Sequence, residues 1–461
     1  MLLKLEANGF KNLVNFDVSF GPFTCIAGEN GVGKSNVFDA IQFLSLIADR
    51  SLLEAAQEVR STRRDGAGDA LSLFTVGLGP RMQLAVEVIV PNMVDDDFGS
   101  RVEPSITLLR YEVALGYELP TSTSRHGRLV VHEEDLRHIN IGDAHKHLRF
   151  PHAARDFRQA VVTGRRSGGK FISTDREKRR ILVHQDGGSR GLPVSGPPIG
   201  AQTTVVSSIN SESQPTILAL RREMQSWRRL ALEPSALRAP DTYQDPQSMG
   251  SDGRHLAAAL HRIATAGESA DDVYARVAAR LSGLAGVDVR GLRVEVDDVR
   301  ELLSIKVTDR QGHAFPARSL SEGTLRYLAL CILLEDPTFT GLVAMEEPEN
   351  GIHPANLGEV IRLVEDLAVD PKIPPGSDNP LRQVIVNTHS PGVVQLVSPD
   401  DLLVATERST DVAGYRVKAL RLRGLKGSWR ASPGELAVTR ADLLAYLVNP
   451  PGAQISLFSV A

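Results

Sequence analysis

The chain has 461 residues, of which 42% are hydrophobic and 23% charged, as in a globular protein with one large core or two smaller ones. Its net charge of −4 excludes a whole-molecule attraction to nucleic acid or to an anionic membrane. No apolar run approaches about 18 residues and no signal-peptide core follows Met1, so we expect a cytoplasmic protein without a membrane span. Cys25 and Cys331 lie in apolar runs, which predicts two buried free thiols.

The first thirty residues predict β structure that leads into a helix. Residues 3–5 predict a short strand, and residues 14–20 alternate between apolar and polar side chains, which is typical of a half-buried strand. Residues 23–27 are an apolar run that ends at Gly28, and from Ser35 apolar residues recur at helical spacing. A buried strand, a glycine-rich turn and a helix therefore follow one another.

The rest of the chain reads as a β-rich segment, a helical segment and an alternating β/α segment. Strand patterns are expected at 82–90, 106–115, 170–183, 292–296, 302–307, 341–345 and 383–387. Helical patterns run from 213 to 286, clearest at 218–232 and 255–266, and recur at 321–334 and 355–367. The Gly-, Pro- and Ser-rich segment 187–198 predicts a mobile loop. We expect an α/β fold with a mixed β-sheet, divided into an N-terminal lobe (1–210), a helical insertion (211–287) and a C-terminal lobe (288–461).

Residues 28–35, Gly-Glu-Asn-Gly-Val-Gly-Lys-Ser, match the phosphate-binding pattern G-x-x-x-x-G-K-[ST] in full. Glycines in such a loop let backbone N–H groups surround an anionic phosphate at a helix N-terminus. Lys34 would reach the β- and γ-phosphates of ATP, and the Ser35 hydroxyl would hold Mg²⁺. The residues of this region expected to bind ATP are Gly28, Asn30, Gly31, Gly33, Lys34, Ser35 and Asn36.

Two adjacent acids, Glu346 and Glu347, follow the apolar strand pattern at 341–345. A phosphate-binding loop enzyme needs a carboxylate at a strand end to bind the metal, and a second one can deprotonate the attacking water. An acidic run after a strand is by itself usually a solvated loop, but its pairing with a complete phosphate-binding loop favours a functional role. We therefore expect Glu346 to contact the metal and Glu347 to act as the base.

Two further segments carry polar groups at the ends of predicted elements. Ser321 and Gly323 stand just before a helix, where a hydroxyl and free N–H groups can bind an anion, although an ordinary helix cap is the simpler interpretation. His389 follows the strand pattern at 383–387, and ligands of open α/β sheets gather at strand carboxyl ends. A histidine there is more often structural, but it is also placed to contact a γ-phosphate.

Taken in chain order, these four motifs resemble the nucleotide-binding heads of ABC-type ATPases, in the branch of the structural-maintenance proteins, RecF and the OLD family. Residues 28–35 resemble Walker A, residues 320–324 the ABC signature, Glu346-Glu347 Walker B with its catalytic glutamate, and His389 the switch histidine. The segments Asp-Gly-Arg-His-Leu (252–256), Ser-Leu-Ser-Glu-Gly-Thr-Leu-Arg (319–326) and Met-Glu-Glu-Pro-Glu-Asn-Gly-Ile-His-Pro (345–354) are similar to those of bacterial OLD-related ATPases of antiphage systems.

The sequence differs from the family pattern at one position and leaves two features of that pattern unplaced. Glu346 stands where most ABC proteins have Asp, a replacement found in the OLD-related subgroup that the chain resembles. The Q-loop glutamine has no clear counterpart, and Gln83 is one candidate. The adenine contacts are equally open, with residues 10–12 (Phe-Lys-Asn) as candidates.

The resemblance implies an ABC-ATPase-like head with a helical insertion in place of a long coiled coil. It also implies a homodimer or higher oligomer, in which Ser321 and Gly323 of one copy touch a γ-phosphate held by Lys34 of the other. Many OLD proteins carry a Toprim nuclease, but only about seventy residues follow His389, too few for that domain, and no D-x-D pair follows Glu407. An effector, nuclease or toxin, would then be a separate polypeptide.

Basic residues gather in two regions. The basic residues of the first region could contact DNA phosphates or an acidic partner, and exposed charges on a hairpin and its loops are at least as good an interpretation. In the second, Arg221-Arg222 and Arg228-Arg229 fall on one expected helix, where a solvated face is the default. The first set comprises Arg165, Arg166, Lys178, Arg179 and Arg180.

The sequence thus predicts an ATPase that regulates or powers a partner effector or a DNA transaction, in antiphage defence. Two alternatives stay open, an ATP-dependent scaffold with slow turnover and a RecF-like DNA-repair ATPase.

Overall fold

The computed structural model describes residues 1–59, 70–119, 127–164, 168–186, 194–266, 269–284, 286–431 and 438–448. An antiparallel sheet of eight strands, in the order β11-β10-β9-β8-β7-β4-β1-β2, forms most of the N-terminal part. In β2 (Phe16–Ser19), Phe16 and Val18 are buried and Asp17 is exposed, which confirms the alternation expected there. The other strands are β1 (Leu2–Asn8), β4 (Arg81–Ile89), β7 (Leu108–Glu118), β8 (Arg128–His138), β9 (Ile172–Asp175), β10 (Arg180–Val183) and β11 (Val194–Pro198).

A second, mostly parallel sheet has the order β12-β17-β18-β3-β19-β20, and only β19 and β20 pair antiparallel. β3 (Phe23–Ala27) and β18 (Arg382–Thr388) are buried at every residue, as in strands covered on both faces. The carboxyl ends of β3, β17 and β18 meet at one edge, which brings residues 28–35, Glu346 and His389 to the same side of the sheet. The remaining strands are β12 (Arg228–Leu230), β17 (Gly341–Glu346), β19 (Leu402–Val412) and β20 (Tyr415–Gly424).

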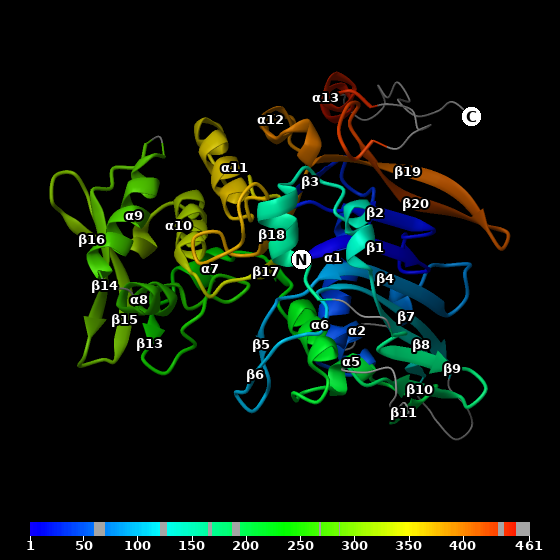
Figure 1. Ribbon diagram of the computed structural model, residues 1–461. Coiled ribbons are helices and arrows are strands. Elements are labelled where there is room, and N and C mark those ends of the chain that lie inside the picture. Colours follow the sequence, from blue (N-terminus) through cyan, green and yellow to red (C-terminus); the bar gives the residue numbers. More distant parts are fainter. Residues whose placement is uncertain are drawn as a thin grey trace.

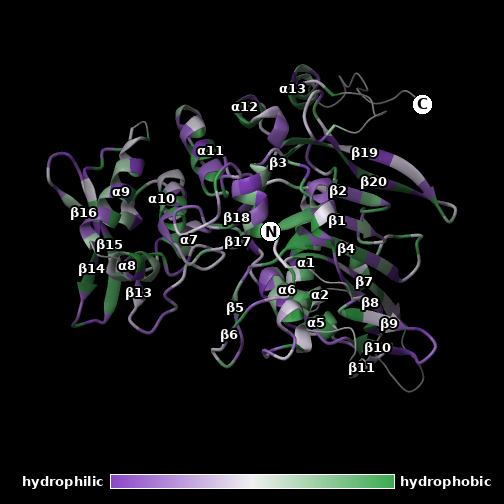
Figure 2. Cartoon of the chain, viewed as in Figure 1, coloured by the Kyte–Doolittle hydropathy of each residue, from purple (hydrophilic) through white to green (hydrophobic). Residues whose placement is uncertain are grey.

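The six-stranded sheet separates two hydrophobic cores. Ile26 of β3 faces the core that contains α1 and the eight-stranded sheet, whereas its neighbours Cys25 and Ala27 face the core that contains α10 and α11. This division follows from the two-residue period of a strand. Cys25 and Cys331 are buried free thiols, as expected. Figure 2 shows the central strands in the hydrophobic colour and the peripheral loops largely in the hydrophilic one.

Helices cover both faces of this sheet. On the first face, α1 contacts α2 and α6; on the second, α10 contacts α7, α8, α9 and α11. α1 and α10 have 14 residues each, and no helix in the described part of the chain is longer. The helices are α1 (Lys34–Ile47), α2 (Leu52–Glu58), α3 (Ala144–His147), α4 (Gln159–Val161), α5 (Val205–Ser208), α6 (Pro215–Gln225), α7 (Pro234–Leu237), α8 (Leu256–Ala266), α9 (Ala270–Ser282), α10 (Glu322–Glu335), α11 (Leu357–Asp366), α12 (Pro391–Leu396) and α13 (Arg440–Val448).

A smaller lobe lies beside the sheet, on the left of Figure 1, and the eight-stranded sheet lies on the right. The smaller lobe contains α8, α9 and a sheet of β13 (Asp241–Thr242), β14 (Gly291–Asp297), β15 (Leu302–Thr308) and β16 (Ala314–Pro316). A hairpin of β5 (Val94–Asp95) and β6 (Arg101–Val102) completes the strands described. The expected α/β fold with mixed sheets and a helical region in place of a long coiled coil is confirmed. No helix within the described ranges is long and apolar enough to cross a membrane.

The structure corrects two local expectations. The helix expected at 218–232 ends at Gln225, and Arg228–Leu230 form β12 beside β17, so the helical segment contributes a strand to the central sheet. The loop expected at 187–198 is wrong for residues 194–198, which form β11 and pair with β10. Residues 187–193 lie outside the described part. The division at 210 and 287 stays a prediction.

Candidate functional site

The glycine-rich turn at 28–35 connects β3 to α1, as the sequence predicts. Gly31 and Gly33 adopt φ angles of 86° and 99°, which L-residues with a side chain rarely adopt. A Cβ on Gly33 would lie 2.2 Å from Nδ2 of Asn12, so Gly33 also makes room for the Asn12 side chain. α1 begins at Lys34, and the free N–H groups of a helix N-terminus are a favourable place for an anion.

Lys34 is folded against the turn that precedes it. Its Nζ donates to the carbonyl oxygens of Gly28 at 2.6 Å and Glu29 at 2.8 Å. The residue is only 5% exposed, and burial lowers the pKa of Lys34, while the carboxylates of Glu347 and Glu346 oppose that shift. The ammonium group is thus held at the mouth of the turn, close to two carboxylates.

The two acids after the buried strand occupy different positions. Glu346 is the last residue of β17, and its Oε2 accepts a hydrogen bond from Oγ of Ser35 at 2.9 Å. Glu347 has a φ of 48°, an unusual conformation for a residue with a side chain. Its N–H donates to the backbone oxygen of Asn387 at 3.0 Å, which fixes the turn against β18. The positive φ of Glu347 is a backbone strain of the kind found at functional sites.

The Glu347 carboxylate is held from two sides. Nδ1 of His389 lies 2.7 Å from its Oε1, and Nδ2 of Asn350 donates to its Oε2 at 2.7 Å. A carboxylate with both oxygens engaged keeps one orientation, as a positioned base requires. His389 therefore contacts the expected base directly.

A cavity of about 260 Å³ is lined by most of the predicted site residues, but not by Gly28, Ser321, Gly323 or His389. Its volume is below the ~300–1,000 Å³ typical of a site that holds a whole small molecule. Gly28 does not line it; a Cβ there would lie 2.8 Å from the oxygen of Ala405, so Gly28 allows β19 to approach. The lining residues are Asn30, Gly31, Gly33, Lys34, Ser35, Asn36, Glu346, Glu347 and Asn387.

Ser321 and Gly323 do not line this cavity. Oγ of Ser321 accepts the N–H of Thr324 at 3.2 Å and caps α10, so the simpler expectation for that side chain is met. A Cβ on Gly323 would lie 2.4 Å from the oxygen of Gly351, which shows that the start of α10 packs against the loop after Glu347. The signature segment thus borders the carboxylate loop of its own chain.

Sequence reasoning missed Arg229, which belongs to the site. The sequence pattern predicted a solvated helix face for Arg229. In the structure, Arg229 lies on β12, and its Nη2 donates to Oε1 of Glu346 at 2.5 Å. Its Nη1 donates to Asp39 of α1 at 3.3 Å. The expectation was also wrong for Arg221, which is buried and donates to the oxygen of Ala48. The alternation of Leu230 and Leu232 before Pro234 was the available sign of a strand.

Two other candidates, Asn12 and Gln83, lie in different parts of the structure. Asn12 lies beside the glycine-rich turn, where it donates to the oxygen of Val32 at 3.1 Å and accepts from Asn36 at 2.8 Å. Gln83 lies on β4 and lines a separate hollow, so it does not contribute to the cavity at the turn.

The basic residues proposed for DNA contact are only partly described, because Arg165 and Arg166 lie outside the described ranges. Lys178 pairs with Asp175, and Nη1 of Arg180 donates to Oγ of Ser195 at 2.9 Å. Arg179 has a φ of 51° in the turn between β9 and β10. These contacts fit the alternative of charges on a hairpin.

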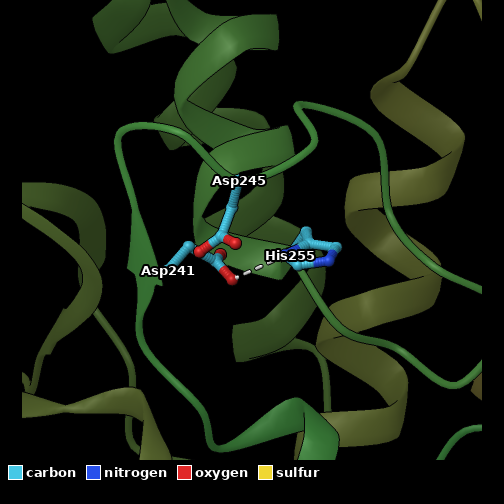
Figure 3. Close-up of side chains that lie close together, drawn as sticks. All are labelled: Asp241, Asp245 and His255. Carbon is cyan, nitrogen blue, oxygen red and sulfur yellow. Dashed lines mark hydrogen bonds and ion pairs between the residues drawn. The ribbon is translucent and has the colours of Figure 1, made fainter.

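Asp241, Asp245 and His255 form the group of potential metal ligands found within the described residues, with ligand atoms within 4.8 Å of one another (Figure 3). Asp241 accepts from Nδ1 of His255 at 3.2 Å and from the N–H of Ala258 at 2.9 Å. Asp245 accepts from the N–H and the hydroxyl of Thr242. The bonds of Asp241 tie the start of α8 to β13, whereas those of Asp245 close the turn that follows β13.

Comparisons with solved structures give matches over nearly the whole chain at low identity. The structure described as "Crystal structure of the SmcHead bound to the C-winged helix domain of ScpA" is 15% identical, with a TM-score of 0.45, and covers 92% of this chain and 98% of its own. The SMC head domain from Thermotoga maritima is 12% identical, with a TM-score of 0.37, and covers 91% and 98%. The Smc head domain with an extended coiled coil, bound to the C-terminal domain of ScpA derived from Pyrococcus furiosus, is 13% identical, with a TM-score of 0.44, and covers 92% and 96%.

Comparison with curated proteins gives no match. Two family descriptions match different parts of the chain. "AAA domain" matches residues 4–51, which include the glycine-rich turn. "AAA domain, putative AbiEii toxin, Type IV TA system" matches residues 146–395, more than half of the 461 residues, including Glu346, Glu347 and His389. Because this second match covers more than half of the chain, the chain belongs to the family described as "AAA domain, putative AbiEii toxin, Type IV TA system".

Proposed function

We propose that this chain binds ATP with Mg²⁺ and hydrolyses it. The observation that carries the proposal is the meeting of Lys34, Ser35, Glu346 and Glu347 around one cavity at the carboxyl edge of a parallel sheet. Backbone N–H groups of the turn and the Lys34 ammonium supply positive charge for the phosphates.

The side chains suit a magnesium ion. Oγ of Ser35 and Oε2 of Glu346 lie 2.9 Å apart, and such hard oxygen donors are the ligands that Mg²⁺ prefers. The ion would neutralise negative charge that develops on the phosphates during transfer. Ser35 and Glu346 would hold it, directly or through water.

Glu347 would accept the proton of the attacking water. Its carboxylate is fixed by His389 and Asn350 and lines the cavity, so it can approach a water beside the terminal phosphate. His389 would keep that carboxylate in place and lie near the γ-phosphate.

We further propose that two copies pair head to tail. Ser321 and Gly323 lie outside the cavity of their own chain, and in a pair with twofold symmetry they would close the site of the other copy. Two nucleotides would then be buried in one interface, and hydrolysis would release it.

The family description names a toxin and a type IV TA system. By extension, we propose that closure of the pair controls a partner effector, a nuclease or toxin, in defence of a bacterial cell against phage. DNA contact through Lys178 and Arg179 is a less favoured addition, given the ion pair of Lys178.

The decisive experiment compares steady-state ATP hydrolysis and ATP-dependent dimerisation in wild type, Glu347→Gln and Ser321→Arg. Glu347→Gln should bind ATP, lose hydrolysis by ~100-fold or more and accumulate as a dimer with ATP. Ser321→Arg should bind ATP as a monomer and hydrolyse it poorly. Assembly with little hydrolysis in wild type would support the scaffold alternative, and absence of ATP binding would refute the proposal. A phage-plating assay with the same variants tests the role in defence.

A further inference from the structure

A chain of alternating charges runs from the loop before β2 to the carboxylate at the end of β17. Its centre is Asp39 of α1, which is 0% exposed. Oδ2 of Asp39 accepts from Nζ of Lys11 at 2.7 Å, and Oδ1 accepts from Nη1 of Arg229 at 3.3 Å. A buried carboxylate is costly unless it is paired, so both cations have a structural reason to lie here.

Arg229 makes a second contact that Asp39 does not require. Its Nη2 donates at 2.5 Å to Oε1 of Glu346, whose other oxygen accepts from Oγ of Ser35. A guanidinium is planar, so the bond of Nη1 to Asp39 fixes the direction in which Nη2 points. The backbone of Arg229 is fixed as well, because β12 pairs with β17 and Arg229 lies opposite Ala344.

This contact bears on the length of the side chain at position 346. A glutamate has one more rotatable bond than an aspartate, so its carboxylate loses more conformational freedom when it is held in one place. Arg229 takes one oxygen and leaves the other directed at Ser35. The longer side chain is thereby restricted to the orientation that the expected metal site needs.

We propose that Arg229 is a positioning residue for the divalent ion that accompanies ATP: it orients Glu346 toward Ser35 and so sets how strongly the metal contributes to nucleotide binding. The inference rests on the proposed function. The competing explanation is that Arg229 only compensates the buried charge of Asp39. That role would change stability without a specific change in metal dependence.

The experiment measures the affinity for a fluorescent ATP analogue with saturating Mg²⁺ and with EDTA, in wild type, Arg229→Met, Arg229→Lys and the control Arg228→Met. Arg228 is the neighbouring residue on the same strand; it is exposed, and its guanidinium lies 5.5 Å from the ring centroid of Phe339. The ratio of the two affinities isolates the contribution of the metal. Half-activating Mg²⁺ for hydrolysis gives a second readout.

In Arg229→Met, the Mg²⁺-dependent gain in affinity should fall by about tenfold or more, the usual effect of removing a residue that orients a metal ligand, while the affinity in EDTA stays unchanged. Arg229→Lys should fall between, because one ammonium cannot bridge two carboxylates as a guanidinium does. It keeps a cation beside Asp39 and serves as the test if Arg229→Met does not fold. Arg228→Met should match wild type.

If both Arg229 variants keep the wild-type Mg²⁺-dependent gain in ATP affinity, the inference is wrong. It is also wrong if Arg228→Met loses as much of that gain as the Arg229 variants do. Either result leaves the proposed function intact. Absence of ATP binding in wild type would refute the proposed function, and the inference would fall with it.

Discussion

Glu346, Glu347 and His389 lie at the ends of β17 and β18, whereas Asp241, Asp245 and His255 lie around the start of α8 in the smaller lobe. Both groups combine a histidine with two carboxylates, and each contains a histidine Nδ1 beside a carboxylate oxygen, at 2.7 Å in the first and 3.2 Å in the second. By residue type alone, either group could be a catalytic or metal site.

The difference lies in where the hydrogen bonds go. In the smaller lobe, Asp241 accepts the N–H of Ala258 and Asp245 accepts the N–H of Thr242, so the carboxylates satisfy the backbone at a helix start and a turn. At the parallel sheet, Glu346 and Glu347 border a cavity beside a helix N-terminus. Acidic side chains are candidates for a functional site when they face a cavity and their oxygens do not accept hydrogen bonds from backbone N–H groups.

The pKa shifts point the same way. Hydrogen bonds from the backbone and side chain of Thr242 lower the pKa of Asp245, as for a carboxylate held in its charged form. Burial raises the pKa of Glu349, two residues after Glu347, and Oε2 of Glu349 has no hydrogen-bond partner among the described residues. Asp245 of the smaller lobe is thus satisfied in its charged form, whereas Glu349, in the loop after β17, is an acid whose charged form is disfavoured.

The largest effect should come from Lys34→Ala, which removes the ammonium group at the mouth of the cavity. We expect ATP hydrolysis to fall by at least ~100-fold, because a preorganised charge opposite the phosphates is lost. Asp245→Ala in the other group should hydrolyse ATP at the wild-type rate. Undiminished turnover in Lys34→Ala would contradict the assignment of the site.

The two histidines offer a matched pair. His389→Ala should lower hydrolysis by ~10-fold or more, because Glu347 loses the contact that orients its carboxylate. His255→Ala should leave the hydrolysis rate per folded molecule unchanged and should lower the thermal midpoint of unfolding, because Asp241 loses a partner. Equal losses of activity in both variants would mean that the smaller lobe takes part in the reaction.

The sequence predicted the parts of the site that are local in the chain. Residues 28–35, Glu346, Glu347 and His389 each follow a strand pattern, and parallel strands bring their carboxyl ends to one edge. Arg229 could not be found this way, because its role depends on β12 pairing with β17 and on Asp39, far away in sequence. Two arginines in a helix-like pattern contain no sign of a buried partner. In the smaller lobe, the patterns at 255–266, 292–296 and 302–307 predicted α8, β14 and β15, but β13, with only two residues, gave no pattern.

A moderate effect on stability is expected for Asp241→Ala. The substitution leaves the N–H of Ala258 without its acceptor inside the protein, which should lower the free energy of unfolding by ~1–3 kcal/mol. Urea denaturation followed by circular dichroism measures this change, and Asp241→Asn, which retains one oxygen, should lose less. A hydrolysis rate that falls in the folded Asp241→Ala protein would break the distinction between the two groups.

The smallest effect concerns the pH dependence that Asp245 contributes. Its folded-state pKa is lowered, first by the N–H of Thr242, so its stabilising contribution is present above the ordinary value of 3.8 and is lost as pH falls through the folded-state value. The difference in unfolding free energy between wild type and Asp245→Asn should therefore shrink as the pH is lowered from about 6 to about 3. The side chain is accessible to solvent, so the change should be small. Denaturant midpoints measured across this pH range test the prediction. If the difference in unfolding free energy between wild type and Asp245→Asn instead grows toward acid, Asp245 is held in its neutral form. A carboxyl group that faces a second carboxylate would behave in that way.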